Sequence, residues 1–207
     1  GPAGENLSFV ASVMNDKHRA AGRSGVGAVM GSKNLKAIIA FGSKRSPIVN
    51  EEKMKEVVKA QVKMLKDNPV TGSGLPALGT KVLDNIINEN GLYPTRNFQE
   101  MQFAGVSAMS GEALVDKYLV KNVACFACPI GCGRLIELPN GKVGEGPEYE
   151  SGWAFGPMCD ISDLNAISEA NLICNDLGLD TISAGVTIAA AMELFERGHI
   201  PVEDLGK

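Results

Sequence analysis

Three cysteines lie within the eight residues CFACPIGC, and this cluster constrains the fold and chemistry of the chain more than any other feature. Cys125, Cys128 and Cys132 have the spacing C-x2-C-x3-C. Spacings this short let one loop present several thiolates to an iron–sulfur cluster. Pro129 and Gly131 suit the sharp turns that such a loop requires. The motif therefore predicts that the three cysteines are ligands of a [4Fe–4S] cluster.

Other chemistries also use clustered cysteines. A zinc site would want a second C-x2-C or a Cys/His pair at finger spacing, and the histidines, His18 and His199, lie far away in the sequence. A radical-SAM cluster uses the reverse order, C-x3-C-x2-C. Three thiols that are merely buried would not require a regular spacing. The spacing therefore favours a cubane cluster, with zinc as the main alternative.

A [4Fe–4S] cluster usually takes four thiolates, so one ligand is missing from the motif. Cys159 is one candidate, but we expect the fourth ligand beyond Lys207. The chain begins at Gly1 without a methionine and stops shortly after a helical pattern, which is typical of a fragment. Cys174, in the stretch NLICND, is predicted to be a small core residue.

Composition narrows the class of protein. The chain has 207 residues, of which 44% are apolar, and a formal charge of −4. This is enough material for a core, and the acidic balance argues against nucleic acid as a partner. No stretch approaches the roughly 20 apolar residues of a bilayer span, so no membrane partner is expected. Clustered thiols favour a reducing compartment, which predicts a cytoplasmic location.

The composition of the chain changes once within its first third. A basic, glycine-rich segment, residues 19–31, leads into the apolar run 35–43, which predicts a buried strand. Ser46-Pro47 is a plausible boundary between a domain spanning 1–47 and one spanning 48–207. The second part opens with a predicted helix that is capped by Asn50, carries one apolar stripe and ends at Asn68-Pro69.

The remaining pattern is mostly helical, which gives an α+β fold class with more helix than strand. Residues 72–79 are predicted to be a loop, and Pro139-Asn140-Gly141 the turn of a hairpin, because Asn-Gly favours a type I′ turn. Helices are predicted at about 82–91, 111–118, 163–177 and 184–197.

Two further segments have residues suited to ligands. The glycine-rich segment 19–31 does not fit the spacing of a P-loop or a dinucleotide fingerprint. Its glycines and its basic residues can nevertheless bring backbone N–H groups and positive charge to a phosphate, although a plain turn between buried strands is the alternative. The run NDLGLDTIS reads as a helix end, a turn and a new helix, and capping explains it without a ligand.

The stretch GEGPEYES places Glu145, Glu148 and Glu150 near one another. On a strand, Glu148 and Glu150 would share a face and Glu145 would not. Such carboxylates are either solvated charges or a source of a general base.

Taken in order, five segments resemble the aldehyde:ferredoxin oxidoreductase family of tungsten enzymes, over nearly the whole chain. They are GPAGEN, AAGRSGVGAVMGSKNLKAI, CFACPIGCGR, GPEYES and CNDLGLDTISAG. The resemblance implies the end of a β-rich pterin-binding domain, residues 1–47, followed by an incomplete helical domain with an iron–sulfur loop, residues 48–207.

The resemblance also implies site residues. Cys125, Cys128 and Cys132 match the family's cluster ligands, with the fourth thiolate in a later domain, and Glu150 matches a glutamate near the metal. Asn175 stands where the pterin-binding pattern has Asp, and an amide oxygen can still accept a hydrogen bond from a pterin amine. The implied pterin-binding residues are Ala20, Ala21, Gly22, Asn175, Gly178, Leu179 and Asp180.

The implied activity is the oxidation of aldehydes to carboxylic acids at a tungsten or molybdenum bis-pterin centre, with magnesium bridging the pterin phosphates. Electrons would pass through the [4Fe–4S] cluster to ferredoxin, and a homodimer is expected. Alternatives are a related tungsten reductase subunit of the benzoyl-CoA reductase type, an iron–sulfur electron-transfer module, and a zinc-stapled binding domain.

Overall fold

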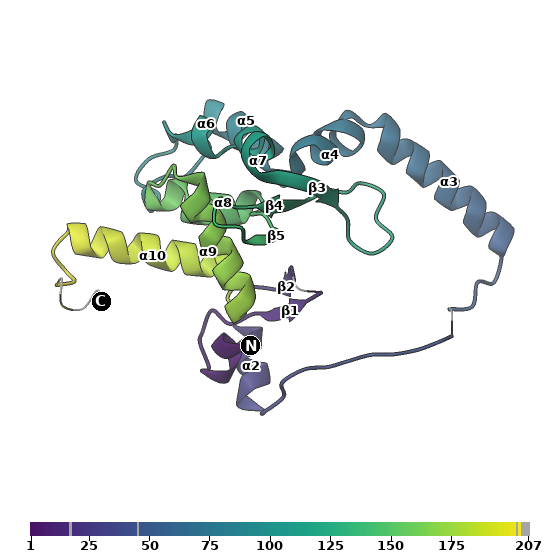
Figure 1. The fold of residues 1–207 in the computed structure, drawn as a ribbon, viewed down its shortest axis with the longest axis horizontal. Coiled ribbons are helices and arrows are strands. Elements are labelled where there is room, and N and C mark those ends of the chain that lie inside the picture. The colour runs from purple at the N-terminus through teal and green to yellow at the C-terminus, as the bar shows by residue number, and fades with distance from the viewer. Residues whose placement is uncertain (17, 45, 202, 204–207) are drawn as a thin grey trace.

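The computed structural model describes residues 1–16, 18–44, 46–201 and 203. About half of these described residues are helical, and their strands form one two-stranded and one three-stranded antiparallel sheet (Figure 1). The predicted mixed class is therefore confirmed. Its division into a β-rich and a helical domain stays a prediction. No helix of the described part of the chain has both the length and the apolarity to cross a membrane.

The N-terminal elements are short and packed backbone against backbone. They are α1 (Pro2–Glu5), β1 (Val13–Asn15), β2 (Arg19–Ala21) and α2 (Val26–Ser32). β1 and β2 pair antiparallel, with Met14 opposite Ala20. A methyl group added at Gly31 would lie 1.8 Å from the carbonyl oxygen of Gly4, so α1 and α2 can approach this closely only without a side chain there.

The prediction of a buried strand at residues 35–43 is wrong. The segment is extended and exposed, with Phe41 99% accessible, and it leads away from α2 toward α3 (Figure 1). A strand is stable only when its N–H and C=O groups pair with a neighbouring strand, and none of the residues that the structure describes supplies one here.

Helix α3 (Glu51–Asp67) confirms the prediction at both ends. The side chain of Asn50 accepts a hydrogen bond from the N–H of Lys53 at 2.9 Å, and Asn68 is extended. The apolar stripe of α3 is largely exposed. The helical stretch continues with η1 (Val70–Gly74, a π-helical turn), α4 (Leu75–Leu78), η2 (Gly79–Val82) and α5 (Leu83–Glu89).

The prediction of a loop at residues 72–79 is therefore wrong, because η1, α4 and η2 cover these residues. The side-chain oxygen of Asn68 accepts from the N–H groups of Val70 and Thr71, at 2.9 and 3.2 Å, and this starts a new helical turn at once. Pro76 lies in the first turn of α4, where a missing N–H costs nothing.

The central sheet has the order β3-β4-β5. It follows two helices, which Ser110 separates. The hydroxyl of Ser110 accepts a hydrogen bond from the N–H of Ala113 and caps α7, the helix predicted at 111–118. The elements are α6 (Val106–Met109), α7 (Gly111–Tyr118), β3 (Leu119–Val123), β4 (Gly133–Glu137) and β5 (Val143–Glu145). The hairpin of β4 and β5 is confirmed, but not the type I′ turn: of the turn residues only Gly141 has positive φ, because the Pro139 ring fixes φ near −65°.

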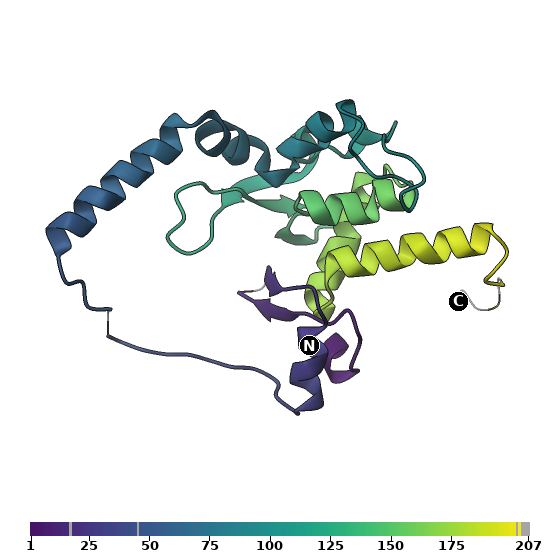
Figure 2. The same ribbon diagram turned by 180° about the vertical axis from the view of Figure 1, so that it is seen from behind.

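The last elements are α8 (Tyr149–Phe155), η3 (Pro157–Cys159), α9 (Leu164–Leu177) and α10 (Thr181–Glu196). α10 begins earlier than predicted because Asp180 caps it. A methyl group at Gly185 would lie 2.6 Å from the carbonyl of Ala154, so α8 and α10 pack closely (Figure 2). The main core is Tyr93, Phe103, Met109, Leu114, Ile136, Leu138, Phe155, Leu164, Ile167 and Cys174.

Candidate cofactor site

The turn between α9 and α10 is fixed against the N-terminal segment by backbone hydrogen bonds. The N–H of Ser12 donates to the carbonyl of Gly178 at 2.8 Å, and the N–H of Asp180 donates to the carbonyl of Val10 at 2.9 Å. Gly178 has φ +77°, which ends α9 in the left-handed conformation that glycine adopts most easily. Two segments far apart in the sequence therefore form one site.

A cavity of about 90 Å³ opens beside this turn, and residues 18–20 of the N-terminal segment also line it. Four of the seven predicted pterin-binding residues line it, namely Ala20, Asn175, Leu179 and Asp180. Gly22 is close by: a methyl group there would lie 2.8 Å from Oδ1 of Asp180. A neighbouring cavity of about 470 Å³ shares His18 and Asn175 with it.

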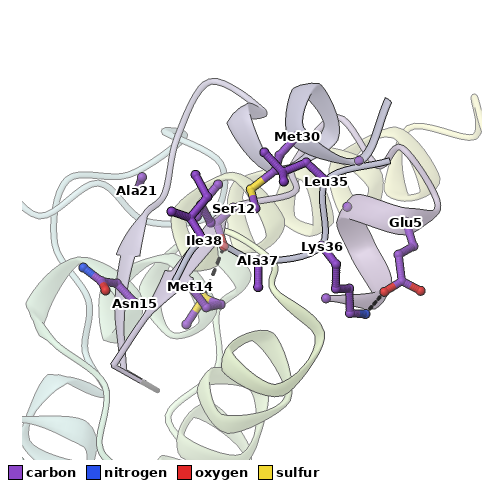
Figure 3. A pocket seen from close by; sticks show the side chains of 15 residues that line it. Glu5, Ser12, Met14, Asn15, Ala21, Met30, Leu35, Lys36, Ala37 and Ile38 are labelled. Atoms are coloured by element: carbon purple, nitrogen blue, oxygen red, sulfur yellow. Dashed lines mark hydrogen bonds and ion pairs between the residues drawn. The ribbon is translucent and has the colours of Figure 1, made fainter. Parts of the chain in front are cut away.

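Ala21 faces a different space. It lines a cavity of about 400 Å³ among α1, β1, α2 and residues 35–38 (Figure 3). Successive residues of a strand point to opposite sides, which separates Ala21 from Ala20 on β2. Apart from the ion pair of Glu5 and Lys36, the labelled side chains of this wall are mostly apolar. The cavity at Ala21 therefore offers a ligand fewer polar side chains than the cavity at Asp180 does.

Asp180 combines two roles. It is buried, and its carboxylate accepts a hydrogen bond from the N–H of Ser183 at 2.8 Å, which caps α10. Next to it, the hydroxyls of Ser151 and Thr181 lie 2.7 Å apart on the cavity wall. The capping interpretation of this segment is thus confirmed, and the same carboxylate reaches the cavity.

Two carboxylates converge on one guanidinium at this cavity. Nη1 of Arg19 donates to Oε1 of Glu148 at 2.9 Å, and Nη2 pairs with Oε1 of Glu145. The other oxygen of Glu148 accepts from the hydroxyl of Thr80 at 2.6 Å. The charges on each segment are evident from the sequence, but their convergence is not. The paired residues lie more than a hundred positions apart, and no local sequence pattern indicates such a pairing.

The pKa values of Glu145 and Arg19 reflect this arrangement. Burial raises the pKa of Glu145 above its ordinary value, although the charge of Arg19 works against the rise. Burial lowers the pKa of Arg19, but the hydrogen bond to Glu148 and the charges of both carboxylates outweigh it, so the pKa is raised. Arg19 is therefore firmly cationic between two acids.

Glu150 lies apart from this network. Residues 149–155 form α8 instead of a strand, so Glu148 and Glu150 do not share a face in the way a strand would give. Glu148 and Ser151 line the cavity, whereas Glu150 is exposed in the first turn of the helix. Burial, together with the charge of Glu150, raises the pKa of Tyr149 to about 12.

The three clustered cysteines lie on the loop between β3 and β4, called here the cysteine loop, residues 124–132 (Figure 1). Cys125 is exposed and the other two are half-buried, and the N–H of Cys128 donates to the carbonyl of Cys125 at 3.0 Å. Ala127 and Gly131 have positive φ. Within the described ranges, no three His, Cys, Asp or Glu side chains are grouped closely enough to hold a metal ion.

The other two cysteines lie elsewhere. Cys174 is buried in the core, as predicted. Cys159 is buried in η3 beside α10, with Sγ 3.5 Å from the carbonyl oxygen of Ala154. Its packing is that of a core residue.

The end of the cysteine loop touches the Arg19 network. A methyl group at Gly133 would lie 2.6 Å from Oε1 of Glu145 and 3.0 Å from Nη2 of Arg19. Arg134, which is buried, donates to the carbonyls of Gly131 and Gly133 and ties the loop end to α4. The cysteine loop and the cavity are therefore neighbours through Arg19.

Two models of known protein families match this chain. The model for domains 2 and 3 of aldehyde ferredoxin oxidoreductase matches residues 56–207, and the model for the N-terminal domain matches residues 1–42. The chain belongs to the aldehyde ferredoxin oxidoreductase family. The predicted boundary at 47/48 stays a prediction.

Two similar relatives are named as tungsten-containing enzymes. The tungsten-containing aldehyde ferredoxin oxidoreductase of Pyrococcus furiosus is 60% identical over 206 residues, and that of Thermococcus kodakarensis is 59% identical. Each match covers the whole of this chain and 34% of the relative. The chain thus spans about a third of the length of the curated relatives it matches.

A solved structure has the same fold. The active-site complex BamBC of benzoyl coenzyme A reductase, in complex with 1,5-dienoyl-CoA, superposes with a TM-score of 0.75 at 24% identity. The match covers 99% of this chain and 32% of that one. At this identity the likeness shows the fold alone.

The residues present suit the cofactors that the family implies. Asn175 and Asp180 offer acceptors for pterin amines at the cavity, and the missing side chain of Gly22 leaves room for the carboxylate of Asp180. Arg19 offers guanidinium donors. The three thiols on one loop are the ligand type that iron–sulfur clusters take.

Proposed function

We propose that the protein oxidises aldehydes to carboxylic acids at a tungsten bis-pterin centre, and passes the electrons through a [4Fe–4S] cluster to ferredoxin. The overall change is R-CHO + H₂O → R-COOH + 2 H⁺ + 2 e⁻, with two ferredoxins each accepting one electron. The names of the relatives that are about 60% identical support tungsten over molybdenum.

One observation carries the proposal beyond family membership. Four of the seven residues expected to hold the pterin line one cavity, and they come from both ends of the chain: Ala20 from β2, and Asn175, Leu179 and Asp180 from the α9–α10 region. The same cavity wall contains Arg19, which adjoins the end of the cysteine loop. Arg19 thus lies between the residues proposed to bind the pterin and the loop proposed to bind the cluster, which supports electron transfer between the two groups.

Each group of residues has its own role in the proposal. Asn175, Gly178, Leu179 and Asp180, with the backbone of Ala20, Ala21 and Gly22, would hold the pterin and its phosphates together with magnesium. Cys125, Cys128 and Cys132 would hold the cluster, with a fourth thiolate from elsewhere in the protein. When bound, the tungsten pterin supplies the two-electron redox chemistry and the cluster supplies the single-electron steps.

Glu150 is the proposed catalytic residue. Its carboxylate is exposed in the first turn of α8 and therefore free to orient a water molecule or to take up a proton. Ferredoxin is the proposed electron acceptor, the enzyme is proposed to be a homodimer, and the free thiols suit the cytoplasm.

Metal and pterin analysis of the full-length protein, followed by assays with a panel of aldehydes and a viologen dye, tests the proposal. Tungsten, pterin and about four irons with aldehyde-dependent dye reduction support it. Tungsten and pterin without aldehyde oxidation would favour a reductase of the benzoyl-CoA type. Iron alone would favour an electron-transfer module, and zinc alone a binding domain.

A further inference from the structure

The contact between Arg19 and the cysteine loop is the strongest feature that the proposed function leaves without a role. The guanidinium is held from two sides, by Glu148 at 2.9 Å and by Glu145. Two charge-assisted contacts, one from each terminal nitrogen to a different carboxylate, fix both the plane and the position of an arginine side chain. Arg19 therefore cannot move away to solvent without leaving two carboxylates unpaired.

The carboxylates are themselves fixed. Oε2 of Glu148 accepts from the hydroxyl of Thr80 at 2.6 Å, and the same hydroxyl accepts from the N–H of Tyr149 at 2.8 Å. Glu145 is buried on β5, whose backbone pairs with β4. The position of the guanidinium thus follows from η2, β5 and the start of α8 together.

The fixed guanidinium lies against the loop end. The space that a Gly133 side chain would fill is taken by Nη2 of Arg19 and Oε1 of Glu145, and Gly133 directly follows Cys132. Glu148 places a negative charge beside the same guanidinium, 2.9 Å from Nη1 of Arg19.

We propose that Arg19 is a positioning residue, which Glu145 and Glu148 hold against the end of the cysteine loop so that its fixed charge raises the reduction potential of the bound cluster. The inference rests on the proposed function, because it requires the [4Fe–4S] cluster. Reduction adds one electron to the cluster, and a nearby positive charge stabilises the more negative state. Glu148, on the same reasoning, lowers the potential.

The test is a redox titration of the full-length enzyme, followed through the paramagnetic signal of the reduced cluster, with iron content measured in every sample. Arg19→Gln should lower the midpoint potential and Glu148→Gln should raise it. Arg19→Lys keeps the charge and should stay nearer the wild-type potential than Arg19→Gln does. Arg96→Gln and Glu196→Gln make the same charge changes at an exposed ion pair and should leave the potential unchanged.

A purely structural role for Arg19 would lower iron content without these opposite shifts, and that result would overturn the inference. So would iron-replete variants of Arg19 and Glu148 that keep the wild-type potential, or shifts equal to those of the two surface controls. A wild-type enzyme without iron would instead overturn the proposed cluster, and this inference with it.

Discussion

The cysteine loop and the α9–α10 turn are both expected to bind a cofactor, yet they are built differently. The turn at residues 178–180 is held by backbone hydrogen bonds to residues 10 and 12, and Asp180 is buried as a helix cap. The cysteine loop has one backbone bond between its first two cysteines, and Cys125 is exposed. Neighbouring parts of one site thus differ in how far the protein alone fixes them.

The difference indicates which part depends on its cofactor. Metal binding couples to local folding where the ligands are not already held in place, and the cysteine loop fits this description. The turn satisfies its backbone groups internally, so it keeps its shape in the absence of a pterin. On the proposed function, the pterin side of the site would be preorganised, and the cluster side would be completed by its metal.

Removing one thiol should give the largest effect. Cys128→Ser in the full-length enzyme should abolish or distort the paramagnetic signal of the reduced cluster and slow electron delivery to ferredoxin, because an iron loses its thiolate. Cys174→Ser, in the core, is the control and should keep the signal. An unchanged signal with full iron content in Cys128→Ser would rule out the ligand assignment.

Hydrogen exchange in iron-free and pterin-free protein tests the comparison directly. The amides of Ser12 and Asp180 are bonded to carbonyls across the site, whereas residues 125–132 lie on an open loop. We expect the two bonded amides to exchange about a hundredfold more slowly, which corresponds to about 2.8 kcal/mol of local opening free energy. Equal exchange in both regions would contradict preorganisation of the turn.

Replacing Glu150 tests a residue that belongs to neither region. General acid–base catalysis typically contributes about 10²–10⁴-fold, so Glu150→Gln should lower kcat by at least roughly tenfold at matched tungsten and iron content. Glu89→Gln, an exposed carboxylate on α5, is the control. If Glu148→Gln lowers kcat and Glu150→Gln does not, the catalytic carboxylate is Glu148.

Two substitutions at Asp180 separate its structural role from its role at the cavity. Asp180→Ala removes the α10 cap and should lower the free energy of unfolding by about 1 kcal/mol, measured by thermal or urea denaturation. Asp180→Asn keeps a capping oxygen and should stay close to wild-type stability while the pterin content falls. Full pterin content in Asp180→Asn would limit the side chain to capping.

Local chemistry made much of the fold predictable. The caps Asn50 and Ser110 and the C-terminal Gly178 each act through neighbours within four residues, so their helix ends followed from the sequence. The hairpin was predictable for the same reason. Its turn type was not, because Pro139 overrides the preference of Asn-Gly.

Long-range partners account for what the sequence could not predict. The apolar run 35–43 has strand propensity, but a strand requires a second strand beside it. The pairing of Arg19 with Glu145 and Glu148 depends on how β2, β5 and α8 are packed. At the candidate site the residue types were therefore predictable, and their grouping was not.

The bonds from residues 10 and 12 to residues 178 and 180 also have a consequence for biosynthesis. A chain emerges from the ribosome with its N-terminus first, and the two halves of the cavity wall are separated by most of this sequence. The wall cannot close until the start of α10 has left the exit tunnel. On the proposed function, pterin insertion would therefore come late, after the segments that carry the cysteines have been made.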